Sequence, residues 1–239
     1  MTGHSEQVDE RSRREVAALP SMFGCWALAS ASALVVVATY WMALQPGAAE
    51  AQTDMVRWIN DPPEPFGTVL AVTNSLLRPV PLAVVALALA GWIVFTARGR
   101  NRWEENRAMV LAYALSEAIT QILKRAAEQP RPIALIAGLD VHGYPRDPHG
   151  NAYPSAHTSV AVGLVTALWP WLTWPQRAVG VAIAALVALN RLYIGAHWPL
   201  DVLGGAAIGL LSGSLCWLVA SKWPIRRTGH QRLLARHSQ

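Results

Sequence analysis

Residues 190–220 read NRLYIGAHWPLDVLGGAAIGLLSGSLCWLVA. The first twelve residues of this stretch contain Arg191, His197 and Asp201, and no charged residue follows Asp201. A helix of about 20 mainly apolar residues is long enough to cross the hydrocarbon core of a bilayer. Because charged side chains are costly inside lipid, the stretch predicts a turn at the membrane surface that leads into a transmembrane helix.

The composition of the whole chain agrees with a membrane protein. Hydrophobic residues make up 53% of the 239 residues and charged residues only 15%, against about 25% charged in a typical soluble domain. The net charge of +5 would suit nucleic acid in a soluble protein. The arginines stand mainly between apolar runs and at the termini, however, which indicates membrane topology. We therefore expect a lipid bilayer, and no nucleic acid, as a partner.

The two cysteines, Cys25 and Cys216, lie inside apolar runs. Neither has the spacing of a metal ligand, and a disulfide is not implied. We expect both to be small buried hydrophobic residues.

Six apolar runs predict an all-α fold, a bundle of six transmembrane helices. Some runs are short, but their polar flanks can extend each helix by a turn. The runs cover residues 22–44, 80–97, 108–123, 158–172, 178–190 and 200–220. We expect one membrane domain at residues 22–221, between a cytoplasmic N-terminal tail at residues 1–21 and a basic cytoplasmic C-terminal tail at residues 222–239.

The positions of lysine and arginine predict the orientation. With the N-terminus inside, most of the 20 lysine and arginine residues fall on the inner side, as expected of a cytoplasmic face. Both termini are therefore placed in the cytoplasm of a multi-pass inner or plasma membrane protein, and the plan favours a bacterial source. An alternative is a cleaved signal peptide, because Ala49-Glu50-Ala51 resembles a processing site. The apolar run before it is longer than the usual signal core of about 7–15 residues, so we expect residues 1–51 to be retained.

Three polar clusters fall on the extracytoplasmic side of the six-helix plan, where they predict a phosphate pocket. Arginine offers a planar fork to two phosphate oxygens, and lysine offers a compact charge. Pro154 and Ser155 suit the start of a helix, whose free N–H groups attract anions. The clusters are Lys124 with Arg131, Ser155 with His157, and Arg191 with His197 and Asp201.

The two histidines in these clusters can divide the chemistry of phosphoryl transfer. One can attack phosphorus while the other protonates the leaving oxygen. Asp201 stands four residues after His197, so its carboxylate can hold the tautomer of that imidazole and stabilise its cation. This spacing favours His197 as the nucleophile and His157 as the general acid.

At these residues the sequence resembles the type 2 phosphatidic acid phosphatase superfamily, the membrane lipid phosphate phosphatases. The motifs of that family are K-x6-RP, PSGH and SR-x5-H-x3-D. Here they stand as Lys124 to Arg131-Pro132, as Pro154-Ser155-Ala156-His157, and as Asn190-Arg191 to His197 and Asp201.

The resemblance implies a helical bundle with the site near the outer membrane face, a phosphohistidine intermediate on His197, and no metal or other cofactor. It also implies that His157 is the general acid. The residues it assigns to the phosphate are Lys124, Arg131, Ser155, Ala156 and Arg191. Two positions depart from the family pattern, since Ala156 replaces glycine and Asn190 replaces serine. Alanine still supplies a backbone N–H, and the contacts of Asn190 are left open.

Two further features lie beside the motifs. Glu117 shares a helical face with Lys124 and is either a polar contact between helices or a partner that orients a cation. The 133–153 loop is long enough to act as a lid, although its histidines, His142 and His149, are expected to be solvated loop residues. The loop at residues 45–66 is expected to hold a short interfacial helix beside the site.

These features together predict an integral membrane phosphatase that acts on a lipid phosphate or diphosphate. Polyprenyl diphosphate is the preferred substrate, ahead of phosphatidylglycerol phosphate and phosphatidic acid. The alternatives are a phosphotransferase that uses a lipid phosphate donor, and a lipid transport or binding protein on the same fold. Vanadium-dependent haloperoxidases have a similar pocket but are soluble. The oligomeric state is left open.

Overall fold

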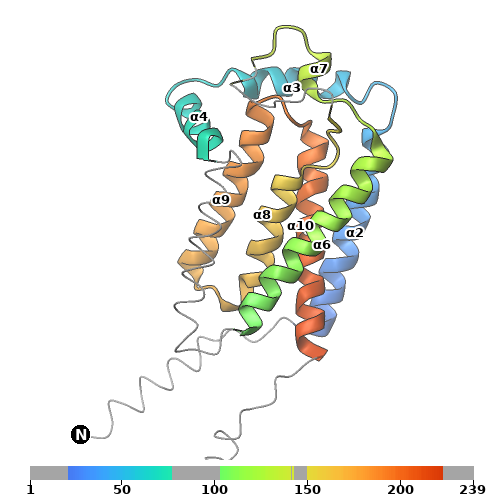
Figure 1. Cartoon of the computed structure of the whole chain (residues 1–239), viewed down its shortest axis with the longest axis vertical. Coiled ribbons are helices and arrows are strands. Elements are labelled where there is room, and N and C mark those ends of the chain that lie inside the picture. Colours follow the sequence, from blue (N-terminus) through green and yellow to red (C-terminus); the bar gives the residue numbers. More distant parts are fainter. Residues whose placement is uncertain (1–20, 77–102, 141, 143–149, 223–239) are drawn as a thin grey trace, which may run out of the picture.

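The computed structural model describes residues 21–76, 103–140, 142 and 150–222, and this part of the chain contains helices and no strands (Figure 1). The all-α prediction is therefore confirmed for these residues. The α-helices are α2 (Met22–Ala43), α3 (Glu50–Asn60), α4 (Phe66–Leu76), α6 (Trp103–Ala127), α7 (Pro132–Leu135), α8 (Ala156–Leu168), α9 (Trp174–Tyr193) and α10 (Pro199–Lys222), and α8 runs on into the 3-10 helix η1 (Trp169–Trp171).

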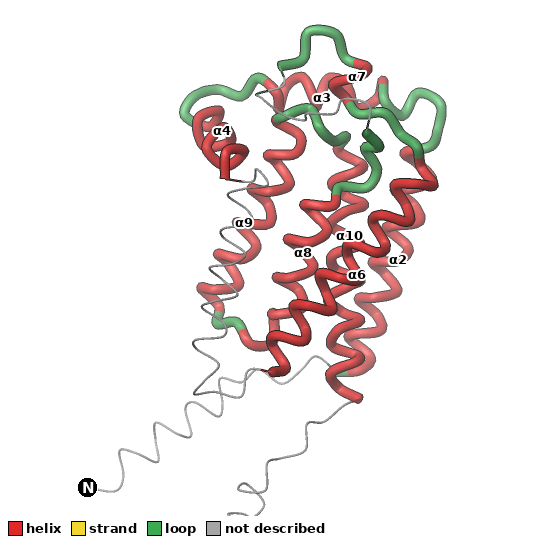
Figure 2. Tube along the Cα trace, viewed as in Figure 1, coloured by secondary structure: helices red, strands yellow, loops and turns green. Residues whose placement is uncertain are grey.

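The long helices α2, α6, α8, α9 and α10 run alongside one another, while α3 and α7 lie across one end of the bundle (Figure 1). Most of the described loops gather at that same end (Figure 2). Helix α10 lies at the centre, because it packs against α8, α2 and α6. The polar loops and the first turn of the central helix therefore meet at one end of the molecule.

Glycines in α10 let it approach α8 closely. A Cβ atom on Gly205 would lie 2.5 Å from the carbonyl oxygen of Ser155, and one on Gly209 would lie 2.6 Å from that of Ser159. Only glycine fits at such distances, and small residues of this kind let the backbones of membrane helices pack together. This close packing fixes the first turn of α8 against the first three turns of α10.

The observed helices coincide with five of the six predicted runs and extend most of them. The runs at residues 108–123 and 178–190 become α6 and α9, which are longer because their charged and polar ends also wind into helix. The run at residues 80–97 lies outside the described residues, so the six-helix count stays a prediction. By length and composition, Met22–Ala43 and Pro199–Val219 could cross a membrane.

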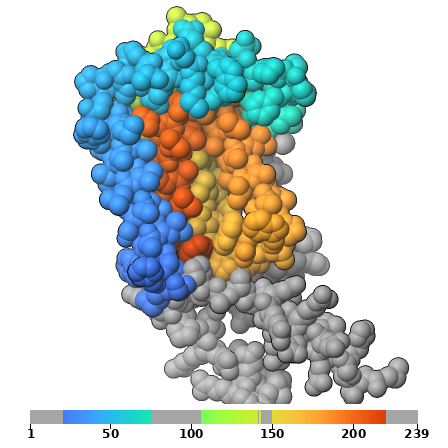
Figure 3. All heavy atoms as spheres, turned by 180° about the vertical axis from the view of Figure 1, so that it is seen from behind, coloured from blue at the N-terminus to red at the C-terminus, as the bar shows by residue number. Residues whose placement is uncertain are grey.

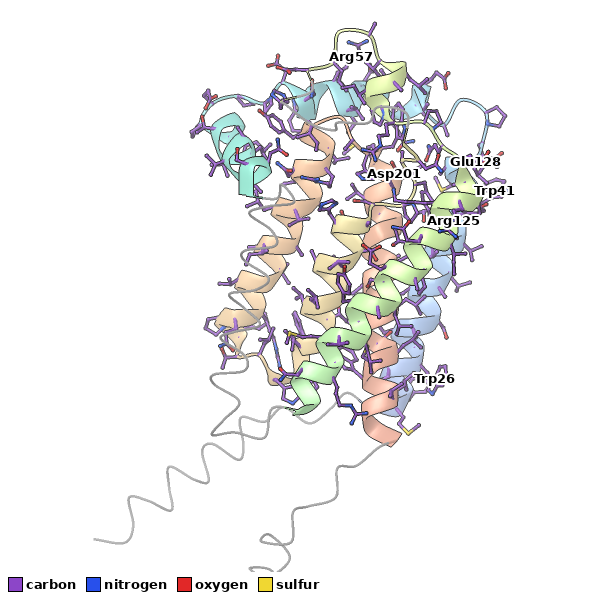
Figure 4. All side chains as sticks on the ribbon, viewed as in Figure 1. Trp26, Trp41, Arg57, Arg125, Glu128 and Asp201 are labelled. Carbon is purple, nitrogen blue, oxygen red and sulfur yellow. The ribbon has the colours of Figure 1, made fainter. Side chains whose placement is uncertain are left out.

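The outer face of α2 is strongly apolar. Phe23, Leu34 and Val37 are 83%, 72% and 65% exposed, which suits contact with lipid better than contact with water. Trp26 and Trp41, near the two ends of the helix, point away from the bundle (Figure 4). Tryptophan at these levels is typical of the membrane–water interfaces.

The expected helix in the 45–66 loop is α3, and it covers the turn between α9 and α10. One side of α3 is buried. Val56 packs against Trp198, and Ile59 packs against Leu192 and Ile194. The side-chain oxygen of Gln52 accepts a hydrogen bond of 2.9 Å from the backbone N–H of Leu200 at the start of α10. Helix α3 therefore closes the polar end of the bundle.

Both cysteines are buried, as predicted, with 2% of each exposed. Cys25 packs against Trp217, and Cys216 packs against Ala112 and Ala167. The expected tails at residues 1–21 and 222–239 lie almost wholly outside the described residues, so the domain bounds stay a prediction.

Candidate active site

The third sequence cluster spans the turn between α9 and α10. Arg191 stands in the last turn of α9, His197 in the turn itself, and Asp201 in the first turn of α10. Their exposed fractions are only 2%, 4% and 0%. The sequence predicted a turn at the membrane surface, and in the structure neighbouring segments of the chain cover the three side chains of this turn.

The segment that leads into α7 covers the α9–α10 turn from one side. The indole N–H of Trp198 donates to the carbonyl oxygen of Pro130 at 2.9 Å. The backbone N–H of Ile133 donates to the carbonyl oxygen of Gly195 at 3.2 Å. Gly195 has a φ of +65°, a conformation that glycine adopts without steric cost. These bonds bring Arg131 to the turn that carries His197.

Asp201 lies at the end of α10 nearest α3 and α7 (Figure 4), and its carboxylate lies beside the ring of His197. Nδ1 of His197 is 3.5 Å from Oδ2 of Asp201. The same carboxylate oxygen accepts a hydrogen bond of 2.7 Å from the backbone N–H of Trp198. A separation of 3.5 Å is longer than a good hydrogen bond, but such bonds in ligand-free sites often tighten when substrate binds. Since Nδ1 faces the carboxylate, Nε2 is the ring nitrogen available for chemistry.

The segment just before α8 holds the first cluster in place. Nζ of Lys124 donates to the carbonyl oxygens of Asn151 at 2.7 Å and Ala152 at 3.4 Å. Nε of Arg131 donates to the carbonyl oxygen of Gly150 at 3.1 Å. The amide of Asn151 in turn donates to the carbonyl oxygen of Lys124 at 2.9 Å. Both cations are therefore fixed to the backbone of Gly150, Asn151 and Ala152, a short segment just before the second motif.

Ser155 is the N-cap of α8, as the sequence predicted. Its backbone N–H donates to the carbonyl oxygen of Asp201 at 3.0 Å, and its hydroxyl accepts from that of Thr158 at 3.0 Å. Ala156 is the first residue of the helix, and its backbone is not in the positive-φ region. Alanine in place of the family glycine therefore causes no backbone strain here.

Charges from four parts of the chain act on His197. Burial is the largest influence that lowers its pKa well below the usual histidine value, and nearby positive charge lowers it further. An imidazole in this position is neutral at neutral pH, which is the state in which it can attack phosphorus. The groups that act on it are Lys124 in α6, Arg131 before α7, Arg191 in α9 and His157 in α8.

No three His, Cys, Asp or Glu side chains come together as a metal site in the described ranges. The charge that gathers around the two histidines is positive, so the arrangement suits an anion. A phosphoryl group spreads negative charge over its oxygens as it is transferred, and such cations stabilise that charge.

Asn190, at the second departure from the family pattern, is fully buried and joins two parts of the structure. Its Oδ1 accepts a hydrogen bond from Nη2 of Arg191. Its Nδ2 donates to the carbonyl oxygen of Leu70 in α4 at 2.8 Å. Asparagine has both a donor and an acceptor at its tip, so one side chain links the guanidinium to α4.

Glu117 accepts a hydrogen bond of 3.2 Å from the amide of Gln121, one turn further along α6. The ammonium of Lys124 is instead bonded to carbonyl oxygens before α8. The carboxylate is close enough to act on Lys124 electrostatically. Its role as an orienting partner stays a hypothesis.

His142 is partly buried in a hydrogen-bonded network, with 21% of its side chain exposed, so it is not the simple solvated loop residue that the sequence predicted. Its ring stacks on that of Tyr193 at a centroid distance of 3.9 Å. Its Nε2 lies 3.0 Å from the carbonyl oxygen of Asn60, and its Nδ1 lies 3.1 Å from the Tyr193 hydroxyl. Contacts with α3 and α9 replace solvent around the ring. His149 and part of the predicted lid, residues 141 and 143–149, lie outside the described residues.

Tyr153 is a structural residue of the site that sequence reasoning missed. It is fully buried, and burial raises its pKa to about 12. Its hydroxyl lies 2.9 Å from that of Thr39 and 3.1 Å from the carbonyl oxygen of Val36. It therefore anchors the start of α8 to α2. Its place directly before the second motif was the only signal, and its partners are more than a hundred residues away.

Comparison with known proteins gives the class of this site. The sequence profile of the PAP2 superfamily matches residues 106–225, which is half of the chain and contains all three motifs. The match agrees with an all-helical fold that joins two histidines to three cations, and together they define a membrane phosphatase of lipid phosphates. The chain belongs to the PAP2 superfamily.

Two curated relatives carry names within this class. The chain is 31% identical to phosphatidylglycerophosphatase B of Bacillus subtilis over 158 residues, which cover 64% of this chain and 71% of the relative. It is 29% identical to the undecaprenyl-diphosphatase of Sulfolobus acidocaldarius over 125 residues, which cover 50% of this chain and 57% of the relative.

One solved structure has the same fold. It is a transmembrane PAP2-type phosphatidylglycerolphosphate phosphatase from Bacillus subtilis, similar with a TM-score of 0.64 over 83% of this chain and 98% of that chain. Its sequence identity is only 20%, so the likeness concerns the fold.

Proposed function

We propose that this protein hydrolyses a polyprenyl diphosphate through a phosphohistidine formed on His197. The observation that carries the proposal is the set of groups around the buried imidazole of His197. Asp201 lies on one side of this ring, and the charges of Lys124, Arg131 and Arg191 act on the ring. A neutral histidine held beside a carboxylate and among cations suits nucleophilic attack on a phosphate.

In this proposal the phosphate lies among the three cations and the start of α8. Lys124, Arg131 and Arg191 bind its oxygens through charge-assisted hydrogen bonds. The Ser155 hydroxyl and the backbone N–H of Ala156 bind it at the helix N-terminus, where free N–H groups favour an anion.

The reaction then takes place in two steps. Nε2 of His197 attacks phosphorus as the P–O bond to the leaving group breaks, and His157 gives its proton to the leaving oxygen. Asp201 stabilises the positive charge that develops on the His197 ring. In the second step His157 takes a proton from a water molecule, the water oxygen attacks phosphorus, and the N–P bond breaks. Inorganic phosphate leaves, and both histidines return to their starting states.

Polyprenyl diphosphate is the preferred substrate because one of the relatives is named an undecaprenyl-diphosphatase. Phosphatidylglycerol phosphate is the next candidate, from the name of the other, and phosphatidic acid is the third. All three lipids present a terminal phosphate to the same cations, so the head group alone does not choose between them.

The test is phosphate release by the purified protein in detergent with EDTA, over a panel of these three lipids. We expect the highest kcat/KM with the polyprenyl diphosphate and no turnover by His197→Ala. With a substrate labelled at its terminal phosphate, the wild-type protein should carry an acid-labile phosphoryl group after quenching, and the variant should carry none. Undiminished release by His197→Ala would refute the mechanism, and a better rate with another lipid would replace the proposed substrate.

We further propose six transmembrane helices in residues 22–221, with the tails at residues 1–21 and 222–239 in the cytoplasm and the site on the extracytoplasmic side of a bacterial membrane. The support is the bias of lysine and arginine toward the inner segments. Reporter fusions at both termini test this topology. An extracytoplasmic signal at either end would contradict it.

A further inference from the structure

Lys124 and Asn151 are joined by two hydrogen bonds that run in opposite directions. Nζ of Lys124 donates to the backbone carbonyl oxygen of Asn151 at 2.7 Å, and Nδ2 of Asn151 donates to the backbone carbonyl oxygen of Lys124 at 2.9 Å. The first bond holds the ammonium group, and the second holds the backbone from which the lysine side chain extends. One residue, Asn151, therefore fixes both ends of the Lys124 side chain.

The bond to the Lys124 backbone acts at the end of α6, a helix on one face of the bundle. Helix α6 lies in front of α8 and α10 in Figure 1, whereas α2, α8, α9 and α10 form the surface of the bundle seen from behind (Figure 3). Lys124 is in the last turn of α6, where carbonyl oxygens have no full set of partners within the helix. The Asn151 side chain supplies a partner from a distant segment, so it acts as a cap on this helix end.

The residue after α6 makes this cap more important. The helix ends at Ala127, and Glu128 follows with a φ of +46°, a conformation that glycine adopts more easily than glutamate. The backbone N–H of Glu128 donates to the carbonyl oxygen of Lys124 at 3.4 Å, which is long for a hydrogen bond. The bond from Asn151, at 2.9 Å, is the shorter of these two.

The bonds of the ammonium group also decide which of its hydrogens can meet a substrate. An ammonium has three N–H donors. Within the described part of the chain, Lys124 uses one on Asn151 and a second, at 3.4 Å, on Ala152, which leaves the third for a phosphate oxygen. Ala152 is itself fixed, because it is fully buried and its N–H donates to the carbonyl oxygen of Gln129 at 2.7 Å. The direction of the third N–H is therefore set by the segment that contains Asn151.

We propose that Asn151 is a positioning residue that acts through Lys124. It holds the ammonium group in the place where that group meets the phosphate, so the charge needs no rearrangement when the substrate binds. Asn151 itself does not touch the substrate. The proposal rests on the proposed function, because it takes Lys124 as a phosphate-binding residue.

The first test measures the binding of inorganic phosphate, the product of the proposed reaction, by titration calorimetry on the full-length protein in detergent with EDTA. Asn151→Ala removes the bond to the Lys124 carbonyl oxygen and should weaken phosphate binding by about tenfold, the size expected when a charge-assisted hydrogen bond is misaligned. In a Lys124→Gln background the same substitution should have no further effect, because the group through which Asn151 acts is gone. Unchanged affinity in Asn151→Ala would contradict the positioning role.

Asn74→Ala is the matched control. Asn74 is also a buried asparagine that donates to a backbone carbonyl oxygen, that of His142 at 3.1 Å, but it lies in α4. This variant should bind phosphate with the wild-type affinity. An equal loss in Asn74→Ala, or an undiminished loss when Asn151→Ala is combined with Lys124→Gln, would show that Asn151 does not act through Lys124.

A further variant separates positioning from stability. Glu128→Gly relaxes the left-handed residue after α6 and should raise the Tm of Asn151→Ala toward that of the wild type. The phosphate affinity of this double variant should nevertheless stay about tenfold below wild type. Recovery of the affinity together with the Tm would refute the proposal, because Asn151 would then act on stability alone. A wild-type protein that binds phosphate but releases none from the three lipids would instead refute the proposed function and leave the positioning role standing.

Discussion

Asp201 gives the sharpest test of how the site works. Its carboxylate is fully buried, lies 3.5 Å from Nδ1 of His197 and accepts a hydrogen bond from the backbone of Trp198. In Asp201→Asn the side chain keeps its shape and an oxygen for the Trp198 bond, but loses its negative charge. The substitution therefore removes the electrostatic contribution while it preserves the packing.

The distance sets the size of the expected loss. Two unit charges 3.5 Å apart interact by about 5 kcal/mol at an effective dielectric constant of about 20. If about half a positive charge develops on the His197 ring in the transition state, the lost stabilisation is about 2–3 kcal/mol, which corresponds to about a hundredfold in rate. The cations around the site bind the phosphate of the substrate before the reaction, whereas the charge of Asp201 acts on the positive charge that develops in the transition state. The loss should therefore appear in kcat, with KM unchanged or lowered.

The assay is steady-state phosphate release with circular dichroism and thermal unfolding to confirm the fold. Asp140→Asn is a matched control, because Oδ2 of Asp140 also lies 3.5 Å from a histidine, His142, but 68% of its side chain is exposed. Exposed ion pairs contribute little, so this variant should stay within twofold of wild type, a margin of about 0.4 kcal/mol. A loss in kcat of less than tenfold in folded Asp201→Asn, or an equal loss in both variants, would show that the charge of Asp201 does not act on the reaction.

Three other changes test the pH dependence, the buried asparagine and the helix packing. Burial and nearby positive charge lower the pKa of His197, so its imidazole stays neutral as the pH falls. The acid limb of a kcat/KM–pH profile should therefore lie below about 6.5, the ordinary pKa of histidine. An acid limb at or above that pH would contradict the electrostatics of the site. The groups that face this histidine are Lys124, Arg131, His157, Arg191 and Asp201. Asn190→Ala removes the hydrogen bonds to Arg191 and Leu70. It should lower kcat/KM by about tenfold, since a hydrogen bond to a charged group contributes about 1.5–3 kcal/mol. Asn190→Ser should keep part of the activity that Asn190→Ala loses, and an equal loss in both variants would mean that Asn190 acts through packing alone. Gly205→Ala places a Cβ atom 2.5 Å from the carbonyl oxygen of Ser155 and should cost about 1–3 kcal/mol of stability, measured as a lower Tm; an unchanged Tm would mean that α10 moves away from α8 without loss.

Local chemistry allowed much of the fold to be predicted from the sequence. The start of α8 at Ser155 was predicted because serine is favoured at the N-cap position of a helix, and the start of α10 lies within one residue of the predicted apolar run at residues 200–220. A short helix was also expected in the 45–66 loop, and α3 lies there. The prediction for His142 failed because its partners, Asn60 and Tyr193, come from other helices.

The sequence by itself determined which chemical groups the site could contain. Motif spacing identifies the histidines, the cations and Asp201, since the types of side chain and their order are written in the chain. Only the tertiary structure decided how these groups are held. The carbonyl oxygens that fix Lys124 and Arg131, and the link from Asn190 to α4, are backbone positions that any residue could provide.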